Sequence, residues 1–220
     1  MTVTEQQIQE ALKNLIDPNT HKDYVSTKSA RNIKVEGDKV SVEILLGYPG
    51  KTQVEPIRED VTRALKAIPG VGGVSVSVQM KIVPHAVQRG VKLVPNIKNI
   101  IAVASGKGGV GKSTVAVNLA LGLAAEGASV AVLDADIYGP SQPTMLGIRG
   151  RPESRDGKTL QPMEGHGLQA MSIGFLIDVE TPMVWRGPMV TQALEQLLNE
   201  TQWRDVDYLV VDLPPGTGDI

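Results

Sequence analysis

The segment at residues 103–114, VASGKGGVGKST, constrains the fold of this chain more than any other. Residues 106–113 satisfy the pattern G-x-x-x-x-G-K-[ST], in which glycines let successive backbone N–H groups curl around an anion. The apolar run IIAVAS precedes this loop, and an apolar segment of helical character follows it over residues 112–126. A strand, a glycine loop and a helix in this order predict a phosphate site at a helix N-terminus.

Further apolar segments continue the alternation beyond the loop. SVAVLDAD and VDYLVVDLPPG are strands that end in aspartate, GLQAMSIGF indicates a short strand, and MVTQALEQLLNE indicates a helix. Continuous apolar runs such as IIAVAS are typical of strands buried on both faces. We therefore predict an α/β fold of the P-loop NTPase type over residues 99–220, with a mostly parallel sheet and helices on both faces.

The first 83 residues have a different pattern. Helical spacing over residues 4–16 and around Ile57–Ile68 alternates with period-two strands near residues 31–35, 39–46 and 74–83. The order αββαβ predicts a small α+β domain at residues 1–83. Residues 84–98 break both periodicities and contain two prolines and a glycine, so they are predicted to be the linker between the two domains.

Each residue type in the loop has a chemical role to play around a nucleotide. Lys112 is placed to reach the β- and γ-phosphates of ATP, and the Ser113 hydroxyl to ligate Mg²⁺. The predicted nucleotide-binding residues are Gly106, Lys107, Gly108, Gly109, Val110, Gly111, Lys112, Ser113 and Thr114.

Acidic residues at strand ends complete the predicted site. Asp212 closes the strand YLVVD and is expected to hold the Mg²⁺ shell, either directly or through water. Asp134 and Asp136 end the neighbouring strand; one is a turn or supporting group, and the other orients the attacking water. We favour Asp136, because it lies further out of its strand, and predict Lys107, Lys112 and Asp136 as the catalytic residues.

The composition of the chain argues against several kinds of binding partner. The net charge is −2 and only 3% of residues are aromatic, so no basic surface or stacking platform for nucleic acid is expected. There is no cysteine, which excludes a disulfide framework and a thiolate metal site within these residues. The polar beginning MTVTEQQIQE is no signal peptide and no apolar run reaches a membrane span, so we expect a cytoplasmic protein that does not engage membranes.

The motifs also carry a family resemblance. KGGVGKST resembles the deviant Walker A motif of the MinD/ParA-type P-loop ATPases. DADIYGPSQPTMLG, MSIGFL, WRGPMV and VVDLPPGTGD are similar to motifs of the Mrp/ApbC iron–sulfur cluster carrier ATPases. The first 80 or so residues resemble the small iron–sulfur-assembly-associated domain that is often fused ahead of them.

The resemblance implies roles for individual residues. Lys107 takes the position of the signature lysine, which acts across a nucleotide-sandwich homodimer; the alternative is that Lys107 only compensates charge near a bound triphosphate. Asp136 lies at the switch I position, and residues 212–219 span switch II. Magnesium-dependent, slow ATP hydrolysis would accompany the binding and transfer of iron–sulfur clusters to apoproteins, with other assembly proteins as partners.

One departure from the family pattern affects the cluster. Family members continue past switch II to a C-x-x-C pair, and two such pairs from two subunits hold a bridging [4Fe–4S] cluster. The present sequence stops at Ile220 and has no iron–sulfur ligand, so we expect a truncated product. Two alternatives stay open: a MinD/ParA-like positioning or partition switch, and a non-catalytic assembly scaffold. A dinucleotide oxidoreductase leaves the Lys112–Ser113 pair unexplained.

Overall fold

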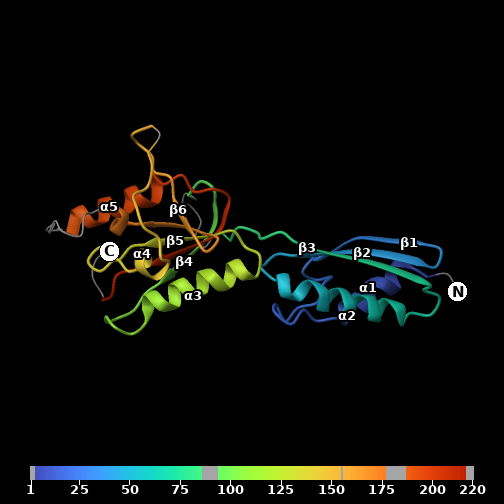
Figure 1. Cartoon of the computed structure of the whole chain (residues 1–220). Helices are drawn as coiled ribbons and strands as arrows, with labels where there is room; N and C mark the ends of the chain where they lie inside the picture. Colours follow the sequence, from blue (N-terminus) through green and yellow to red (C-terminus); the bar gives the residue numbers. More distant parts are fainter. Residues whose placement is uncertain (1–2, 86–93, 155, 177–186, 217–220) are drawn as a thin grey trace. The chain divides into compact units, whose positions relative to one another are not determined.

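The computed structural model describes residues 3–85, 94–154, 156–176 and 187–216, with the side chains of 187–190 excepted. The chain divides into two compact units, Met1–Val83 and Pro84–Ile220 (Figure 1).

Unit 1 (Met1–Val83) is a three-stranded sheet with two helices. Its strands pair in the order β1-β2-β3, with β2 antiparallel to β1 and parallel to β3. Figure 1 shows α1 and α2 on the same face of this sheet. The elements are α1 (Glu5–Lys13), β1 (Ala30–Glu36), β2 (Lys39–Leu46), the 3-10 turn η1 (Lys51–Gln53), α2 (Val54–Lys66) and β3 (Gly73–Met80). The αββαβ order predicted from the sequence is confirmed.

Side-chain periodicity explains why these elements form. In β2 every second residue is buried, which places one apolar row against the helices. The Thr4 and Gln7 side chains form a capping box at the start of α1, satisfying backbone N–H groups that the helix leaves free. The core of unit 1 is an apolar cluster that includes Ile8, Leu12, Val40, Val42, Ile44, Leu46, Ile57, Val61, Leu65 and Val78.

Unit 2 (Pro84–Ile220) contains a five-stranded sheet in the order β4-β8-β5-β7-β6. The pairs β4–β8, β8–β5 and β5–β7 are parallel, and β6 is antiparallel to β7. The elements are β4 (Ile97–Val103), α3 (Lys112–Ala125), β5 (Val130–Asp134), α4 (Gln142–Met145), β6 (Met163–Gly165), β7 (Leu168–Ser172), the 3-10 turn η2 (Ile173–Phe175), α5 (Gly187–Asn199) and β8 (Val206–Asp212).

Helices lie on both sides of this sheet. The crossover from β4 through α3 to β5 and the crossover from β7 through α5 to β8 run across the sheet in opposite directions. Right-handed crossovers therefore place α3 and α5 on opposite faces, as Figure 1 shows. The predicted P-loop NTPase-type α/β fold is confirmed. None of the helices in the described ranges is long and apolar enough to span a membrane.

Two details differ from the sequence-based expectation. All five residues of β5 are buried, as predicted, but Ile100 in β4 is 48% exposed. The prediction that IIAVAS is buried on both faces was wrong, because β4 is an edge strand of the described sheet. Strand β4 also begins at Ile97, inside the segment 84–98 predicted as linker. His85 from that segment donates its backbone N–H to Asn99 Oδ1 at 2.9 Å.

Candidate functional site

The carboxyl ends of four parallel strands line up at one edge of the unit 2 sheet. Val103 of β4 pairs with Asp212 of β8, Asp212 with Asp134 of β5, and Asp134 with Ser172 of β7. The glycine loop leaves β4 directly after Val103, so it starts from the same edge as both aspartates. Ligands of open parallel sheets bind at this edge.

The glycine loop has the backbone of an anion cradle. Gly109 and Gly111 have φ values of +74° and +89°, a left-handed conformation that favours glycine. A Cβ atom added at Gly106, Gly109 or Gly111 would meet no atom within 4 Å, so open space lies beside the loop. Helix α3 begins at Lys112 without a side-chain cap. Its first N–H groups are therefore available to an anion, as the helix dipole favours.

Lys112 is the centre of a buried charged cluster. The residue is 9% exposed, and its Nζ forms an ion pair with Asp212 Oδ1. The same nitrogen lies 3.8 Å from Asp136 Oδ2 and donates to Ser113 Oγ at 3.3 Å. Four residues predicted for the site thus meet around one ammonium group. A phosphate that binds at this helix terminus must compete with two carboxylates for Lys112.

Asp134 has a different environment from Asp136. Its side chain is fully buried and accepts hydrogen bonds from the N–H groups of Asp136, Ser141 and Gln142, and from Ser172 Oγ, at 2.9–3.2 Å. Burial raises the pKa of the Asp134 carboxyl to about 6, although the backbone hydrogen bonds act in the opposite direction. Asp134 therefore ties the loop at residues 135–141 to the end of β5, while Asp136 lies beside Lys112.

Gln142 is a residue that the sequence-based prediction missed. Its side chain is 1% exposed, and its Nε2 donates to Asp212 Oδ2 at 2.9 Å and to the Ser113 carbonyl at 3.2 Å. Its Oε1 and the neighbouring Ser141 Oγ are buried without a partner among the described atoms. The sequence feature that could have indicated Gln142 is its place as the first residue of α4, directly after the DADIYGPS segment.

The other predicted residues of the loop lie at the surface. Lys107 is exposed, and its carbonyl accepts from Ser105 Oγ at 3.0 Å. Thr114 is also exposed, and Val110 is 51% exposed. Asp219, the far end of the predicted switch II, lies outside the described residues. The predicted action of Lys107 across a dimer stays a prediction.

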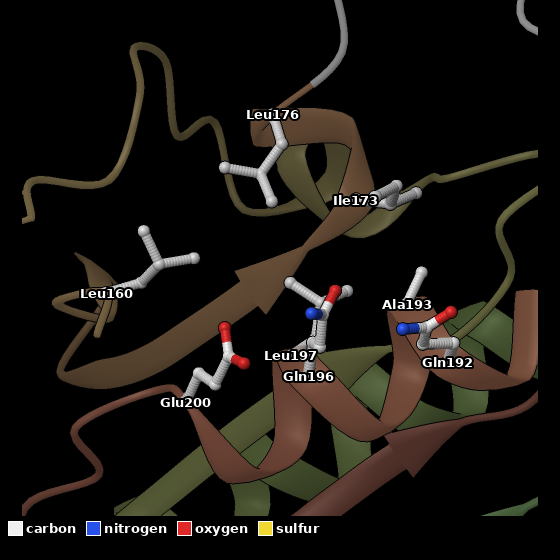
Figure 2. Close-up of a pocket in the computed structure, with 8 residues that line it drawn as sticks. All are labelled: Leu160, Ile173, Leu176, Gln192, Ala193, Gln196, Leu197 and Glu200. Atoms are coloured by element: carbon white, nitrogen blue, oxygen red, sulfur yellow. The ribbon is translucent and has the colours of Figure 1, made fainter. Parts of the chain in front are cut away.

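A separate cavity of about 350 Å³ lies against α5. Figure 2 shows Leu160, Ile173 and Leu176 across from α5, which contributes Gln192, Ala193, Gln196 and Leu197, with Glu200 just beyond the helix. Glu200 is the one ionisable side chain in this lining. The cavity includes none of the predicted site residues and lacks their cluster of charges.

The geometry of unit 2 defines the class of protein. A glycine loop between a parallel strand and a helix, with a lysine and a serine at the helix start and aspartates at adjoining strand ends, is the arrangement of a P-loop NTPase. The model of the family described as "NUBPL iron-transfer P-loop NTPase" matches residues 96–220. The chain belongs to this family. A second model, described as "Iron-sulfur cluster assembly protein", matches residues 5–78. Both matches confirm the resemblance seen in the motifs.

Several curated relatives carry the name iron-sulfur cluster carrier protein. One from Pseudomonas fragi is 58% identical over 71% of this chain and 55% of its own length. Relatives from Escherichia coli strain K12 and from Synechocystis are 47% and 45% identical over 95% and 94% of this chain. The present chain spans 57% and 60% of the length of these two relatives.

Among solved structures, a nucleotide-binding protein from Archaeoglobus fulgidus in complex with ADP is 41% identical. The match covers 56% of this chain and 47% of that chain, with a TM-score of 0.49.

Proposed function

We propose that this chain is the magnesium- and ATP-binding part of an iron–sulfur cluster carrier that hydrolyses ATP slowly. The observation that carries the proposal is the meeting of Lys112, Ser113, Asp136 and Asp212 at the start of α3, beside an open glycine loop. The names of the relatives favour cluster transfer to apoproteins over a positioning or partition switch.

The residues of the chain divide the work on the nucleotide. Backbone N–H groups of residues 108–114 bind phosphate oxygens, and Lys112 exchanges its carboxylate partners for the β- and γ-phosphates. Asp136, freed from Lys112 by this exchange, orients the attacking water and accepts its hydrogen bond. Catalysis of this kind depends on positioning and charge neutralisation.

The oxygen donors beside Lys112 fit a magnesium ion. Ser113 Oγ and Asp212 are hard oxygen ligands, and Gln142, which donates to Asp212, has a buried Oε1 with no partner among the described atoms. No group of three His, Cys, Asp or Glu side chains gathers as a metal site in the described ranges. The ion would therefore need phosphate oxygens as well as Ser113 and Asp212. When bound, it neutralises charge that develops on the phosphates.

Lys107 supports the proposal of a homodimer. The side chain is exposed and makes no hydrogen bond or ion pair among the described residues. Val110, three residues after Lys107, is 51% exposed, and Tyr138, in the predicted switch I segment, is 65% exposed. A partner subunit would cover such groups, and Lys107 would then reach the partner's nucleotide as an arginine finger does.

The cluster itself is cargo, and these residues do not hold it. The chain contains no cysteine, so no thiolate ligand for iron lies within the 220 residues. We assign the P-loop domain to residues 97–220 and the assembly-associated domain to residues 1–83, for which docking of client or assembly proteins is the proposed role. A cytoplasmic location stays a prediction.

Nucleotide titration tests the proposal. ATP with Mg²⁺ should slow hydrogen exchange of the amides at residues 108–114, and Lys112→Ala should abolish this protection. Lys107→Ala should keep the protection and lower phosphate release, because its action requires the partner's nucleotide. The exposed Lys158 is a matched control, and Lys158→Ala should behave as the wild type. An unprotected loop in the wild-type chain would refute nucleotide binding.

A further inference from the structure

Gln142 connects three parts of the site that are distant in sequence. Its backbone N–H is held by Asp134 Oδ2 at 3.0 Å, which fixes the start of α4 to the end of β5. Its side-chain amide reaches Asp212 at the end of β8 and the carbonyl of Ser113 in α3. The side chain is almost fully buried, so these contacts are shielded from water.

The chemistry of its partners fixes how the amide is oriented. The Ser113 carbonyl and the Asp212 carboxylate are both acceptors, so the NH₂ group of Gln142 must face them. The opposite orientation would place Oε1 against two oxygens. Oε1 is therefore directed elsewhere, and it remains a buried acceptor without a partner among the described atoms. Such an acceptor carries a free-energy cost unless a donor reaches it.

The two oxygens of Asp212 are divided between Lys112 and Gln142. Lys112 Nζ pairs with Oδ1, and Gln142 Nε2 donates to Oδ2 at 2.9 Å. When Lys112 binds a phosphate instead, Asp212 loses its ion pair. The Gln142 amide is neutral, so the phosphate does not attract it, and its hydrogen bond to Asp212 stays in place. Gln142 then remains as the group that holds the fully buried carboxylate in one orientation.

From these contacts we infer that Gln142 is a positioning residue for the metal shell, an inference that rests on the proposed function. Its Nε2 holds Asp212, the carboxylate that would bind the metal, in one orientation, and ties it to the carbonyl of Ser113, the other residue that would bind the metal. Groups that orient metal ligands in this way set metal affinity as well as activity.

The test compares metal binding with nucleotide binding in the full chain. Mn²⁺ is titrated into the ADP complex and followed by electron paramagnetic resonance, while ADP affinity is measured without metal. Gln142→Met keeps the side-chain length but removes both polar atoms. We expect Mn²⁺ affinity to fall about tenfold or more, and metal-free ADP affinity to equal that of wild type. Gln192, exposed on α5, provides the control variant Gln192→Met, which should change neither quantity.

The possible outcomes separate the two proposals. If the wild-type chain binds neither ADP nor Mn²⁺ with ADP, the proposed function fails. Wild-type binding with an unchanged Mn²⁺ affinity in Gln142→Met overturns the role of Gln142 alone. Loss of metal-free ADP binding in Gln142→Met would also overturn it, since Gln142 would then support the loop fold rather than the metal shell.

Discussion

Both units bury a carboxylate, but they hold it in different ways. In unit 1, Asp17 is 4% exposed; the Tyr48 hydroxyl lies 2.8 Å from each of its oxygens, and the Asn19 N–H donates to it at 2.9 Å. These partners are neutral. In unit 2, Asp212 is fully buried and is held by the Lys112 ammonium and by Gln142.

Asp17 and Asp212 differ in whether a bound ligand could replace one of their partners. The partners of Asp17 are neutral donors, and no buried side-chain polar atom of unit 1 lacks a partner in the part of the chain that is described. Asp212, in contrast, has a charged partner, Lys112, that phosphate can attract, and its other partner, Gln142, has an unsatisfied buried Oε1. A satisfied buried network stabilises a fold, whereas a cluster with an exchangeable charge and unmatched acceptors indicates a binding site.

The largest effect is expected at Asp134 of unit 2, because this carboxylate, like Asp17, is held by neutral hydrogen-bond donors. Asp134→Ala removes the acceptor for three backbone N–H groups and one hydroxyl, all buried or partly buried. We expect the free energy of unfolding of unit 2 to fall by about 3 kcal/mol or more, because unsatisfied donors are costly. Hydrogen exchange of the β5 and β7 amides measures this loss.

A surface aspartate is the control for Asp134. Asp156 also accepts backbone N–H groups, from Lys158 and Thr159, but it lies in an exposed loop. Asp156→Ala should leave exchange in β5 unchanged. If the β5 amides of Asp134→Ala exchange as slowly as those of the wild type, the stability of unit 2 does not depend on the hydrogen bonds that Asp134 accepts.

Much of this comparison could be predicted from the sequence, for reasons that differ by element. Strand β2 (Lys39–Leu46) was predicted with its bounds because strict alternation specifies a half-buried strand. The loop before α3 was predicted because glycine spacing and context leave few other structures. The choice between Asp134 and Asp136 followed from their distance along the strand, and the structure places Asp136 beside Lys112.

Other features depend on contacts that no local pattern encodes. Gln142 meets Asp212 across 70 positions and Ser113 across 29, so only the folded sheet brings them together. The exposure of Ile100 depends on the place of β4 at the sheet edge, which an apolar run does not reveal. The three-residue strand β6 is too short to have a period.

A smaller effect is expected from the hydroxyl that holds Asp17. Tyr48→Phe removes the donor to a buried carboxylate, and we expect unit 1 to lose about 2 kcal/mol of stability. ADP affinity in unit 2 should stay at the wild-type value. Urea unfolding and hydrogen exchange of the β2 amides measure the loss. Tyr24 is the matched control: it is 4% exposed, and Tyr24→Phe removes a hydroxyl without removing a donor to Asp17. If Tyr48→Phe and Tyr24→Phe lose the same stability, the loss in Tyr48→Phe does not come from its hydrogen bond to Asp17.

The last of the three effects is a dependence of the stability of unit 1 on alkaline pH. Burial is the main cause that raises the pKa of Tyr48 to about 12. An unfolded tyrosine titrates near pH 10, so the unfolded chain releases this proton first. The contribution of Tyr48 to stability is therefore fully present below about pH 10 and is lost as the pH rises through about 12.

Comparison with Tyr48→Phe isolates this contribution from other groups that titrate at high pH. The stability difference between wild type and Tyr48→Phe should narrow as the pH rises above about 10, because only the wild type carries the group. Urea unfolding at several alkaline pH values measures the difference, and tyrosinate absorbance locates the titration itself. A constant difference would mean that Tyr48 titrates alike in both states. The hydroxyl would then not be held in the closed network that distinguishes Asp17 from Asp212.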